Sequence, residues 1–128
     1  VLWTAGALPH DWLASAGLKA TNGFPDVSPT LQSLSHPDIF VAGDAAALTG
    51  QSLPKAGVYA VRQGPVLMQN LVARACNLAL REFHPQPDYL KLVSLGKRSA
   101  IAEKWGMTTQ LPGLWSLKTH IDRAFVQD

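Results

Sequence analysis

The 128-residue sequence contains a single cysteine, Cys76, and this scarcity excludes several chemistries. An internal disulfide or a CxxC redox pair needs two cysteines, and a cysteine-rich zinc site needs more. The histidines, His10, His36, His84 and His120, lie far apart and form no HxH or HxxxH spacing, so we expect no metal site. Cys76 lies among apolar residues, and we expect a buried structural thiol rather than a catalytic one.

Long apolar runs and a strong excess of one charge are also missing. No stretch approaches the roughly 20 apolar residues of a membrane-spanning helix, and no charged leader is visible. Eleven Lys and Arg against nine Asp and Glu give a net charge of +2, which is too mild to indicate nucleic-acid binding. Because one cysteine suits a reducing compartment, we expect a cytoplasmic protein. The GxGxxG fingerprint of dinucleotide-binding folds is absent as well.

Apolar residues make up 47% of the sequence, which is enough for a hydrophobic core in one ordinary domain. The first residues, Val1–Thr4, are typical of the middle of a strand and do not include an initiating methionine. We therefore expect the sequence to be a piece of a longer chain.

The first part of the sequence predicts an α/β arrangement. A short helix is predicted over Asp11–Ala16, and Asn22-Gly23 is typical of a turn. The apolar run Ile39–Ala42, closed by Gly-Asp, predicts a parallel strand buried on both faces. A long helix is predicted over Lys55–Arg81, with apolar residues recurring at helical spacing, and Pro65 should kink it or split it in two.

The sequence after the proline-rich connector His84–Pro87 has a different character. Two β-prone runs, Tyr89–Leu95 and Ser99–Trp105, predict a hairpin around a three-residue loop, Gly96-Lys97-Arg98. A last helix is predicted over about residues 113–126, where Leu114, Leu117, Ile121 and Phe125 form an apolar stripe.

Two regions follow from this pattern. Residues 1–83 are predicted to be one end of an α/β sheet domain, and residues 84–128 a small α+β unit with a hairpin and a helix. The first region has few strands for a free-standing parallel sheet, so we expect partner strands from sequence outside it or from a second chain. Because half a sheet leaves open edges, we expect the isolated chain to self-associate.

The strand that ends at Gly43-Asp44 is the most informative candidate site. Ligands of open α/β sheets bind at the carboxyl ends of the strands. Gly43 would let a ligand approach the backbone, and the Asp44 carboxylate suits the hydroxyl groups of a sugar or polyol. A surface aspartate that caps a turn is an equal alternative.

Two further segments could contact the same ligand. The predicted helix start at Lys55-Ala56-Gly57 has free N–H groups and a partial positive charge, which suit an anion or an electron-rich ring. Thr4-Ala5-Gly6 ends the first strand with small residues that permit a close approach. An exposed lysine and an ordinary turn are the alternatives for these two segments.

These segments, in this order, resemble a known family of flavoproteins. Leu2–Gly6 followed by Pro9 is similar to the "ATG" motif of proteins with two dinucleotide-binding domains. His36–Ala46 is similar to their second FAD motif, and Pro54–Gly64 to the helix that follows. The family is the pyridine nucleotide-disulfide oxidoreductase superfamily. Within it, the sequence most resembles type II NADH dehydrogenase-like proteins, and more narrowly the flavoprotein module associated with selenide, water dikinase.

The resemblance implies the C-terminal part of a Rossmann-like FAD flavoprotein with two dinucleotide-binding domains. Asp44, with Gly43 beside it, would bind the ribityl hydroxyls of FAD. The helix start at Lys55, Ala56 and Gly57 would face the pyrimidine edge of the isoalloxazine. The small residues that would line the site near the pyrophosphate or ribityl chain are Thr4, Ala5 and Gly6.

The resemblance also implies an activity for a longer protein. Hydride would pass from NAD(P)H to the flavin and then to an unknown acceptor, and no residue here is assigned a catalytic role. Both GxGxxG motifs would precede Val1, so we expect this chain alone to be inactive. Type II dehydrogenases carry an Ala-Gln-x-x-x-Gln-like pattern on the helix that follows the Gly-Asp motif. Gly57 occupies the position of the first Gln, and Gln63 does not fall at the position of the second, so the sequence does not indicate quinone as the acceptor.

Other functions of the same chain stay open. The apolar residues of Tyr89–Trp105 and Leu114–Phe125 could make the chain an assembly module, with a homo-oligomer or a selenide, water dikinase domain as partner. Alternatively, the basic residues Lys118, His120 and Arg123 could attach the last helix peripherally to the inner face of a membrane. Packing against protein is favoured, since Asp122 interrupts the basic face.

Overall fold

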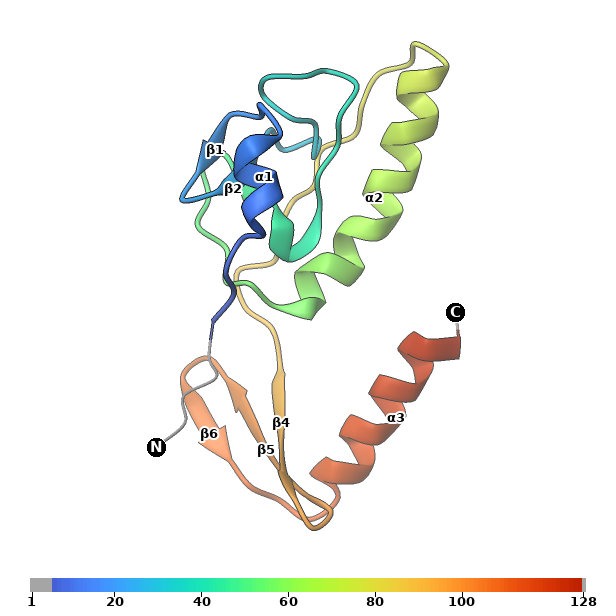
Figure 1. Ribbon diagram of the computed structural model, residues 1–128. Coiled ribbons are helices and arrows are strands. Elements are labelled where there is room, and N and C mark those ends of the chain that lie inside the picture. The colour runs from blue at the N-terminus through green and yellow to red at the C-terminus, as the bar shows by residue number, and fades with distance from the viewer. Residues whose placement is uncertain (1–5, 128) are drawn as a thin grey trace. The chain divides into compact units, whose positions relative to one another are not determined.

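The computed structural model describes residues 6–127, with the side chains of all but Ala14 and 125–127 (Figure 1). The strand predicted over Val1–Thr4 therefore lies outside the described residues. The chain divides into two compact units, Val1–Pro85 and Gln86–Asp128, and the predicted boundary after residue 83 lies close to this division. Each unit is described separately below.

The first unit begins with helix α1 (Asp11–Ser15), as predicted, and a small sheet. Strands β1 (Ala20–Thr21) and β2 (Phe24–Val27) pair in antiparallel fashion, and β2 pairs in parallel with β3 (Ala47–Leu48). The β1–β2 turn is Asn22-Gly23, whose φ angles of +52° and +82° are those of a type I′ turn. The sequence predicted this turn but not the strands that flank it.

The prediction of a buried parallel strand over Ile39–Ala42 is wrong. The segment is extended, but its backbone pairs in antiparallel fashion with the nearby segment Leu31–Ser33. Ser33 N–H donates to the Ile39 carbonyl at 2.8 Å, and Val41 N–H donates to the Leu31 carbonyl at 3.0 Å. Leu31 is fully buried with a φ of +64°, and this left-handed residue turns the chain back on itself. The segment thus pairs with a neighbouring segment of the chain and is not a central strand of a sheet. The Ile39 side chain is exposed.

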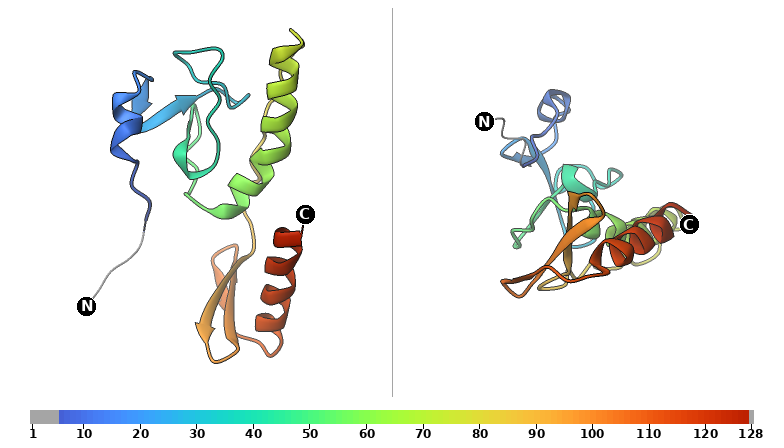
Figure 2. Two further views of the ribbon diagram at one scale, coloured as in Figure 1. Left: turned by 45° about the vertical axis from the view of Figure 1, so that its right-hand side comes forward. Right: turned by 90° about the horizontal axis from the view of Figure 1, so that it is seen from below.

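Helix α2 (Gly57–Ala75) is the longest element and runs through Pro65 without a break, so the predicted splitting does not occur. Its ribbon bends near the first turns in Figures 1 and 2. The helix ends six residues before the predicted Arg81. Asn77 has a φ of +53°, its N–H bonds to the Arg74 carbonyl, and Leu78 N–H bonds to the Ala73 carbonyl at 2.8 Å. These two bonds form a Schellman motif, which terminates the helix.

The side chains of α2 face the unit in an unexpected way. Its buried residues are Tyr59, Gln63, Val66 and Asn70, so that half of the inward face is polar. Conversely, Val61 and Leu71, two of the apolar residues whose helical spacing predicted this helix, are exposed. Cys76 lies at the C-cap and is also exposed, so the prediction of a buried thiol is wrong. The core of the unit is made of Leu13, Val27, Leu31, Ala46, Tyr59, Val66 and Phe83.

The second unit is a three-stranded meander with one helix. Strands β4 (Lys91–Gly96) and β5 (Ser99–Lys104) form the predicted hairpin, although its loop has two residues, Lys97 and Arg98, rather than three. A further strand, β6 (Met107–Thr109), pairs with β5 and was not predicted.

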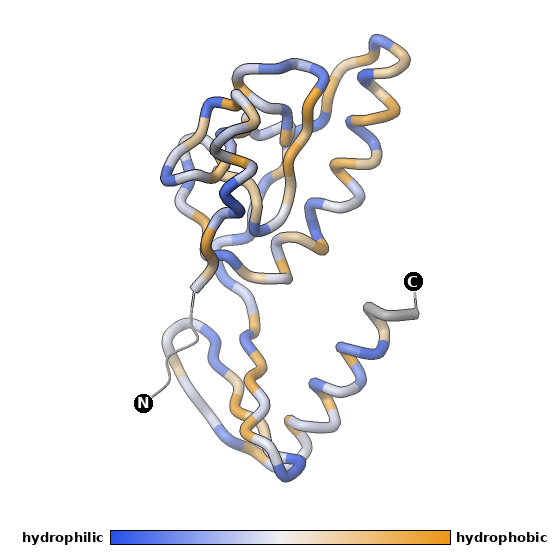
Figure 3. The backbone as a smooth tube through the Cα atoms, in the orientation of Figure 1, coloured by the Kyte–Doolittle hydropathy of each residue, from blue (hydrophilic) through white to orange (hydrophobic). Residues whose placement is uncertain are grey.

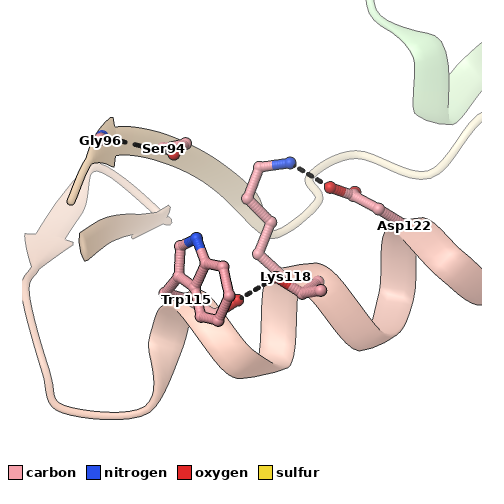
Figure 4. A network of polar contacts seen from close by, with 6 residues as sticks. Ser94, Gly96, Trp115, Lys118 and Asp122 are labelled. Carbon is pink, nitrogen blue, oxygen red and sulfur yellow. Dashed lines mark hydrogen bonds and ion pairs between the residues drawn. The ribbon is translucent and has the colours of Figure 1, made fainter. Parts of the chain in front are cut away.

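Helix α3 (Leu114–Gln127) lies close to the predicted bounds and packs on β5, where Ala100 and Ala102 are buried. In Figure 4, Trp115 and Lys118 extend from this helix on the side of the strand that carries Ser94 and Gly96. Phe125, predicted to belong to its apolar stripe, is outside the side chains described. Within residues 6–127, no helix is both long and apolar enough to cross a membrane.

Candidate functional site

A cavity of about 460 Å³ lies in the first unit, beside the β1–β2 hairpin and the short 3-10 helix η1 (Gly43–Ala45). The loop that follows β3 and the start of α2 complete its wall. Its lining includes carboxylates, amines, amides and two aromatic rings, among them Asp44, Lys55, Gln63, Phe24 and Tyr59.

Gly43 joins η1 to α2. Its N–H donates to the Oε1 atom of Gln63 at 2.5 Å, and the Gln63 side chain is only 3% exposed. Gly43 has a φ of +66°, and a Cβ atom there would lie 3.2 Å from the Cβ of Ala60. We expected Gly43 to let a ligand approach the backbone. In the structure, Ala60 of α2 occupies the space beside Gly43 instead, so helix packing requires the glycine.

Asp44 follows Gly43 in η1 and is exposed at the cavity. Because the preceding N–H is fixed by the buried Gln63, the backbone that carries the carboxylate is held against α2. A carboxylate in this position can accept hydrogen bonds from hydroxyl groups of a molecule in the cavity. The sequence prediction placed Asp44 at the end of a strand, whereas the structure places it in a turn of 3-10 helix.

Lys55 is held at the cavity by two contacts. Its Nζ donates to the Ala46 carbonyl at 2.5 Å and lies 4.1 Å from the centre of the Phe24 ring. Burial lowers the pKa of Lys55 below the usual 10.5, and the negative charge of Asp44 partly opposes this change. Lys55 is therefore fixed beside the cavity. The alternative interpretation, an exposed lysine that extends into solvent, does not apply.

The start of α2 lies next to Lys55. Ala56 is its N-cap residue and supplies no side-chain cap, while Tyr59 N–H bonds to the Ala56 carbonyl at 3.0 Å. A helix start of this kind carries a partial positive charge. Gly57 is the first helical residue, and a Cβ atom there would meet nothing within 4 Å, so close packing does not require a glycine.

Of the third predicted segment, Thr4-Ala5-Gly6, the structure describes only Gly6. Gly6 has a φ of +93° and is exposed, and a Cβ atom there would meet no other atom within 4 Å. It does not line the cavity. Thr4 and Ala5 lie outside the described residues.

Most of the lining residues were not predicted as site residues, and the three that contribute rings or the buried amide are Phe24, Tyr59 and Gln63. Tyr59 and Gln63 are four residues apart, so they share a face of α2. Their spacing of four and eight residues after Lys55 was the sequence signal that could have placed them at the same site. Phe24 was hidden because Phe24-Pro25 is typical of a turn, whereas it begins β2. Among residues 6–127, no cluster of three His, Cys, Asp or Glu side chains could hold a metal ion.

The chain is similar in sequence to part of a known protein. No protein-family model matches the chain. Over 106 residues the chain is 36% identical to "Fe-regulated protein 8" of Mycosarcoma maydis, an alignment that covers 80% of this chain and 26% of that protein. The chain thus spans about a quarter of the length of this relative.

Proposed function

We propose that the chain is the C-terminal part of an FAD-dependent NAD(P)H oxidoreductase, and that its first unit forms one wall of the FAD site. The observation that carries the proposal is the cavity that Asp44 and Lys55 line together, beside Tyr59 and Gln63 of α2. Gly43, Asp44 and Lys55 are three of the residues that the resemblance to FAD-dependent flavoproteins assigns to the cofactor, whereas Ala56 and Gly57, which it also assigns, do not line the cavity.

The residues present fit the cofactor in chemistry. Asp44 is an exposed acceptor that suits ribityl hydroxyls. Lys55 and the uncapped start of α2 supply positive potential, which suits the electron-rich edge of a reduced isoalloxazine. When bound, FAD would supply a hydride acceptor for NAD(P)H.

The protein's own part would be positioning and electrostatics. Gln63 fixes Gly43, and so holds Asp44 where it can accept hydrogen bonds. The Ala46 carbonyl and the Phe24 ring hold the Lys55 amine at the cavity, where its charge can stabilise negative charge. No described residue is assigned the role of general acid or base.

The test is the absorption spectrum of the full-length protein that contains this chain, with Asp44→Ala alongside. We expect oxidised-flavin bands that bleach with NADH or NADPH, and loss of most flavin from the variant. Glu82→Ala, which removes an exposed carboxylate that does not line the cavity, is the matched control and should keep its flavin.

A colourless protein that cannot be reconstituted with FAD would contradict the proposal. Retention of full flavin by Asp44→Ala would leave a flavoprotein but remove Asp44 from the site. The 128-residue chain alone should show no NADH turnover, since both dinucleotide fingerprints are absent from it.

An assembly module is the alternative function, and exposed apolar side chains favour it. In the second unit, Leu90, Val93, Leu95, Trp105 and Leu117 are all exposed. Apolar groups of this number can form an interface with a second copy or with another domain. If the full-length protein carries no flavin, and light scattering shows an oligomer that dissociates when Val93 and Trp105 are made polar, this function is the better one.

A further inference from the structure

The β1–β2 hairpin carries two opposite charges on the face that lines the cavity. Asp26 N–H donates to the Lys19 carbonyl at 2.8 Å, which continues the register in which Ala20 pairs with Pro25. Residues directly opposite each other in an antiparallel pair share a face, with Cβ atoms about 5 Å apart. Lys19 and Asp26 both line the cavity, so their charged side chains are neighbours there.

The protein itself uses neither of these charged groups. Within the described part of the chain, the ion pairs and side-chain hydrogen bonds include neither the Lys19 amine nor the Asp26 carboxylate. Lys19 is exposed, whereas Asp26 is half-buried in β2, the middle strand of its sheet. A half-buried carboxylate without a partner gives up part of its hydration and gains nothing in return. This position therefore favours a ligand that brings a positive charge to Asp26.

An apolar side chain lies beside the two charges. Leu34 N–H donates to the Asp26 carbonyl at 3.1 Å, and Leu34 also lines the cavity, where the residue is 44% exposed. In the parallel register, the partner of Asp26 on β3 is the small residue Ala47, which lines the cavity as well. The surroundings of Asp26 therefore combine a cation, an exposed apolar side chain and a small residue.

These groups lie apart from those assigned to the flavin. Phe24, whose ring centre lies 4.1 Å from the Lys55 amine, precedes Asp26 by two residues in β2 and lines the same cavity. Two residues of a strand span about 7 Å. The change between hydrophilic and hydrophobic residues along this hairpin can be followed in Figure 3. Lys19, Asp26 and Leu34 can therefore hold a ligand of their own, whether or not flavin occupies the rest of the cavity.

We propose that Lys19, Asp26 and Leu34 bind a free α-amino acid with an apolar side chain. The ammonium group of the ligand donates to the Asp26 carboxylate, and its carboxylate accepts from the Lys19 amine, in charge-assisted hydrogen bonds. The two charged groups of an α-amino acid are joined through a single carbon atom, which suits side chains that are cross-strand neighbours. The apolar side chain of the ligand contacts Leu34. A ligand with one charge would leave the other protein group without a partner.

The experiment is isothermal titration calorimetry of the full-length protein that contains this chain, with three probes of similar shape. L-leucine has both charges, isopentylamine lacks the carboxylate, and 4-methylpentanoate lacks the ammonium group. We expect leucine to bind about tenfold more tightly than either of the others, because each of these loses one charge-assisted hydrogen bond. Absence of leucine binding, or equally tight binding of a probe with one charge, would overturn the proposal.

Two variants test the two contacts separately. Asp26→Asn should weaken leucine binding about tenfold, but it should not weaken binding of 4-methylpentanoate, which has no ammonium group. Lys19→Met should weaken leucine binding by a similar factor, but it should not weaken binding of isopentylamine, which has no carboxylate. If each variant weakens all three probes equally, the two side chains do not recognise the two charges and the proposal is wrong.

The matched controls are Asp11→Asn and Lys97→Met, which make the same changes at exposed positions that do not line the cavity. Both should bind leucine as the unchanged protein does, and a loss equal to that of the test variants would contradict the proposal. Flavin absorbance of the same samples separates this site from the proposed FAD site. A colourless protein that binds leucine supports the amino-acid site and contradicts the FAD site, whereas a flavin-containing protein that binds no leucine does the reverse.

Discussion

The side chain of Asn70 in α2 is held by three hydrogen bonds. It is fully buried, and its Nδ2 atom donates to the carbonyls of Thr30 and Arg81, both at 2.8 Å. Its Oδ1 atom accepts the Arg81 N–H at 2.7 Å. A single amide thus joins three segments that are far apart in the sequence.

We expect Asn70→Leu to lower the free energy of unfolding by about 3 kcal/mol, since it leaves one N–H and two carbonyls without this partner. Urea denaturation measures the change. The control is Gln69→Leu, whose exposed side chain accepts a hydrogen bond from the Arg81 guanidinium, and it should change stability by less than about 0.5 kcal/mol. Equal losses in the two variants would show that the Asn70 network carries little stability.

The pKa of Lys55 offers a second prediction at the residue scale. Burial lowers this pKa and the charge of Asp44 raises it, so Asp44→Asn should lower the pKa further. Titration of methylated lysines by NMR measures it, and Glu82→Gln should leave it unchanged. If the pKa of Lys55 is the same in Asp44→Asn as in the unchanged protein, the charge of Asp44 does not act on Lys55.

The sign of the linked stability change follows from the same direction. The folded-state pKa of Lys55 lies below the unfolded value of 10.5. Between these two pKa values the unfolded chain therefore binds more protons than the folded chain. Charged Lys55 therefore lowers stability at neutral pH. This cost is lost as the pH rises through the folded-state pKa toward 10.5, and Lys55→Met should not show that alkaline gain.

At the scale of elements, the contact between η1 and α2 positions the candidate site. Gly43→Ala places a methyl group 3.2 Å from Ala60 at a φ of +66°, so we expect a loss of about 1–2 kcal/mol and a displaced Asp44. Gly64→Ala is the opposite case, because a Cβ there meets nothing within 4 Å inside a helix. It should gain about 0.5–1 kcal/mol. Thermal unfolding compares the two, and a gain for Gly43→Ala would contradict this account.

Elements with a local chemical signal were the ones that the sequence could predict. The turn at Asn22-Gly23, the β4–β5 hairpin and α3 each depend on residues next to one another, and each is present. The segment Ile39–Ala42 was misassigned because an apolar run does not reveal its pairing partner. That partner was decided by the left-handed backbone of Leu31.

The candidate site was predictable in part for the same reason. Asp44 and Lys55 stand in a recognisable order, and both line the cavity. Gln63 was not predicted, because its role depends on a contact with Gly43 across 20 residues. The orientation of α2 was also missed. A polar inward face held by Gln63 and Asn70 reverses the usual amphipathic pattern, so hydrophobic periodicity indicated the wrong face.

At the scale of the whole molecule, this reversal leaves an apolar surface on α2. Val61, Met68 and Val72 recur at helical spacing and are all exposed, with Met68 at 64%. Leu71 extends the same surface. Exposed apolar groups in one row are a site for association, and this surface, in addition to open strand edges, is a reason for the isolated chain to self-associate.

We therefore expect light scattering to show that the average mass of the 128-residue chain rises with concentration. Met68→Lys with Val72→Lys should shift it toward the monomer, because burying two cations in an apolar contact is costly. Leu8→Lys with Leu111→Lys adds the same charge at exposed apolar positions that do not belong to α2 and should leave the association in place. If both pairs dissociate the chain equally, net charge is the cause and the α2 face is not the interface. A monomer at every concentration would show that the face is tolerated in water by this chain.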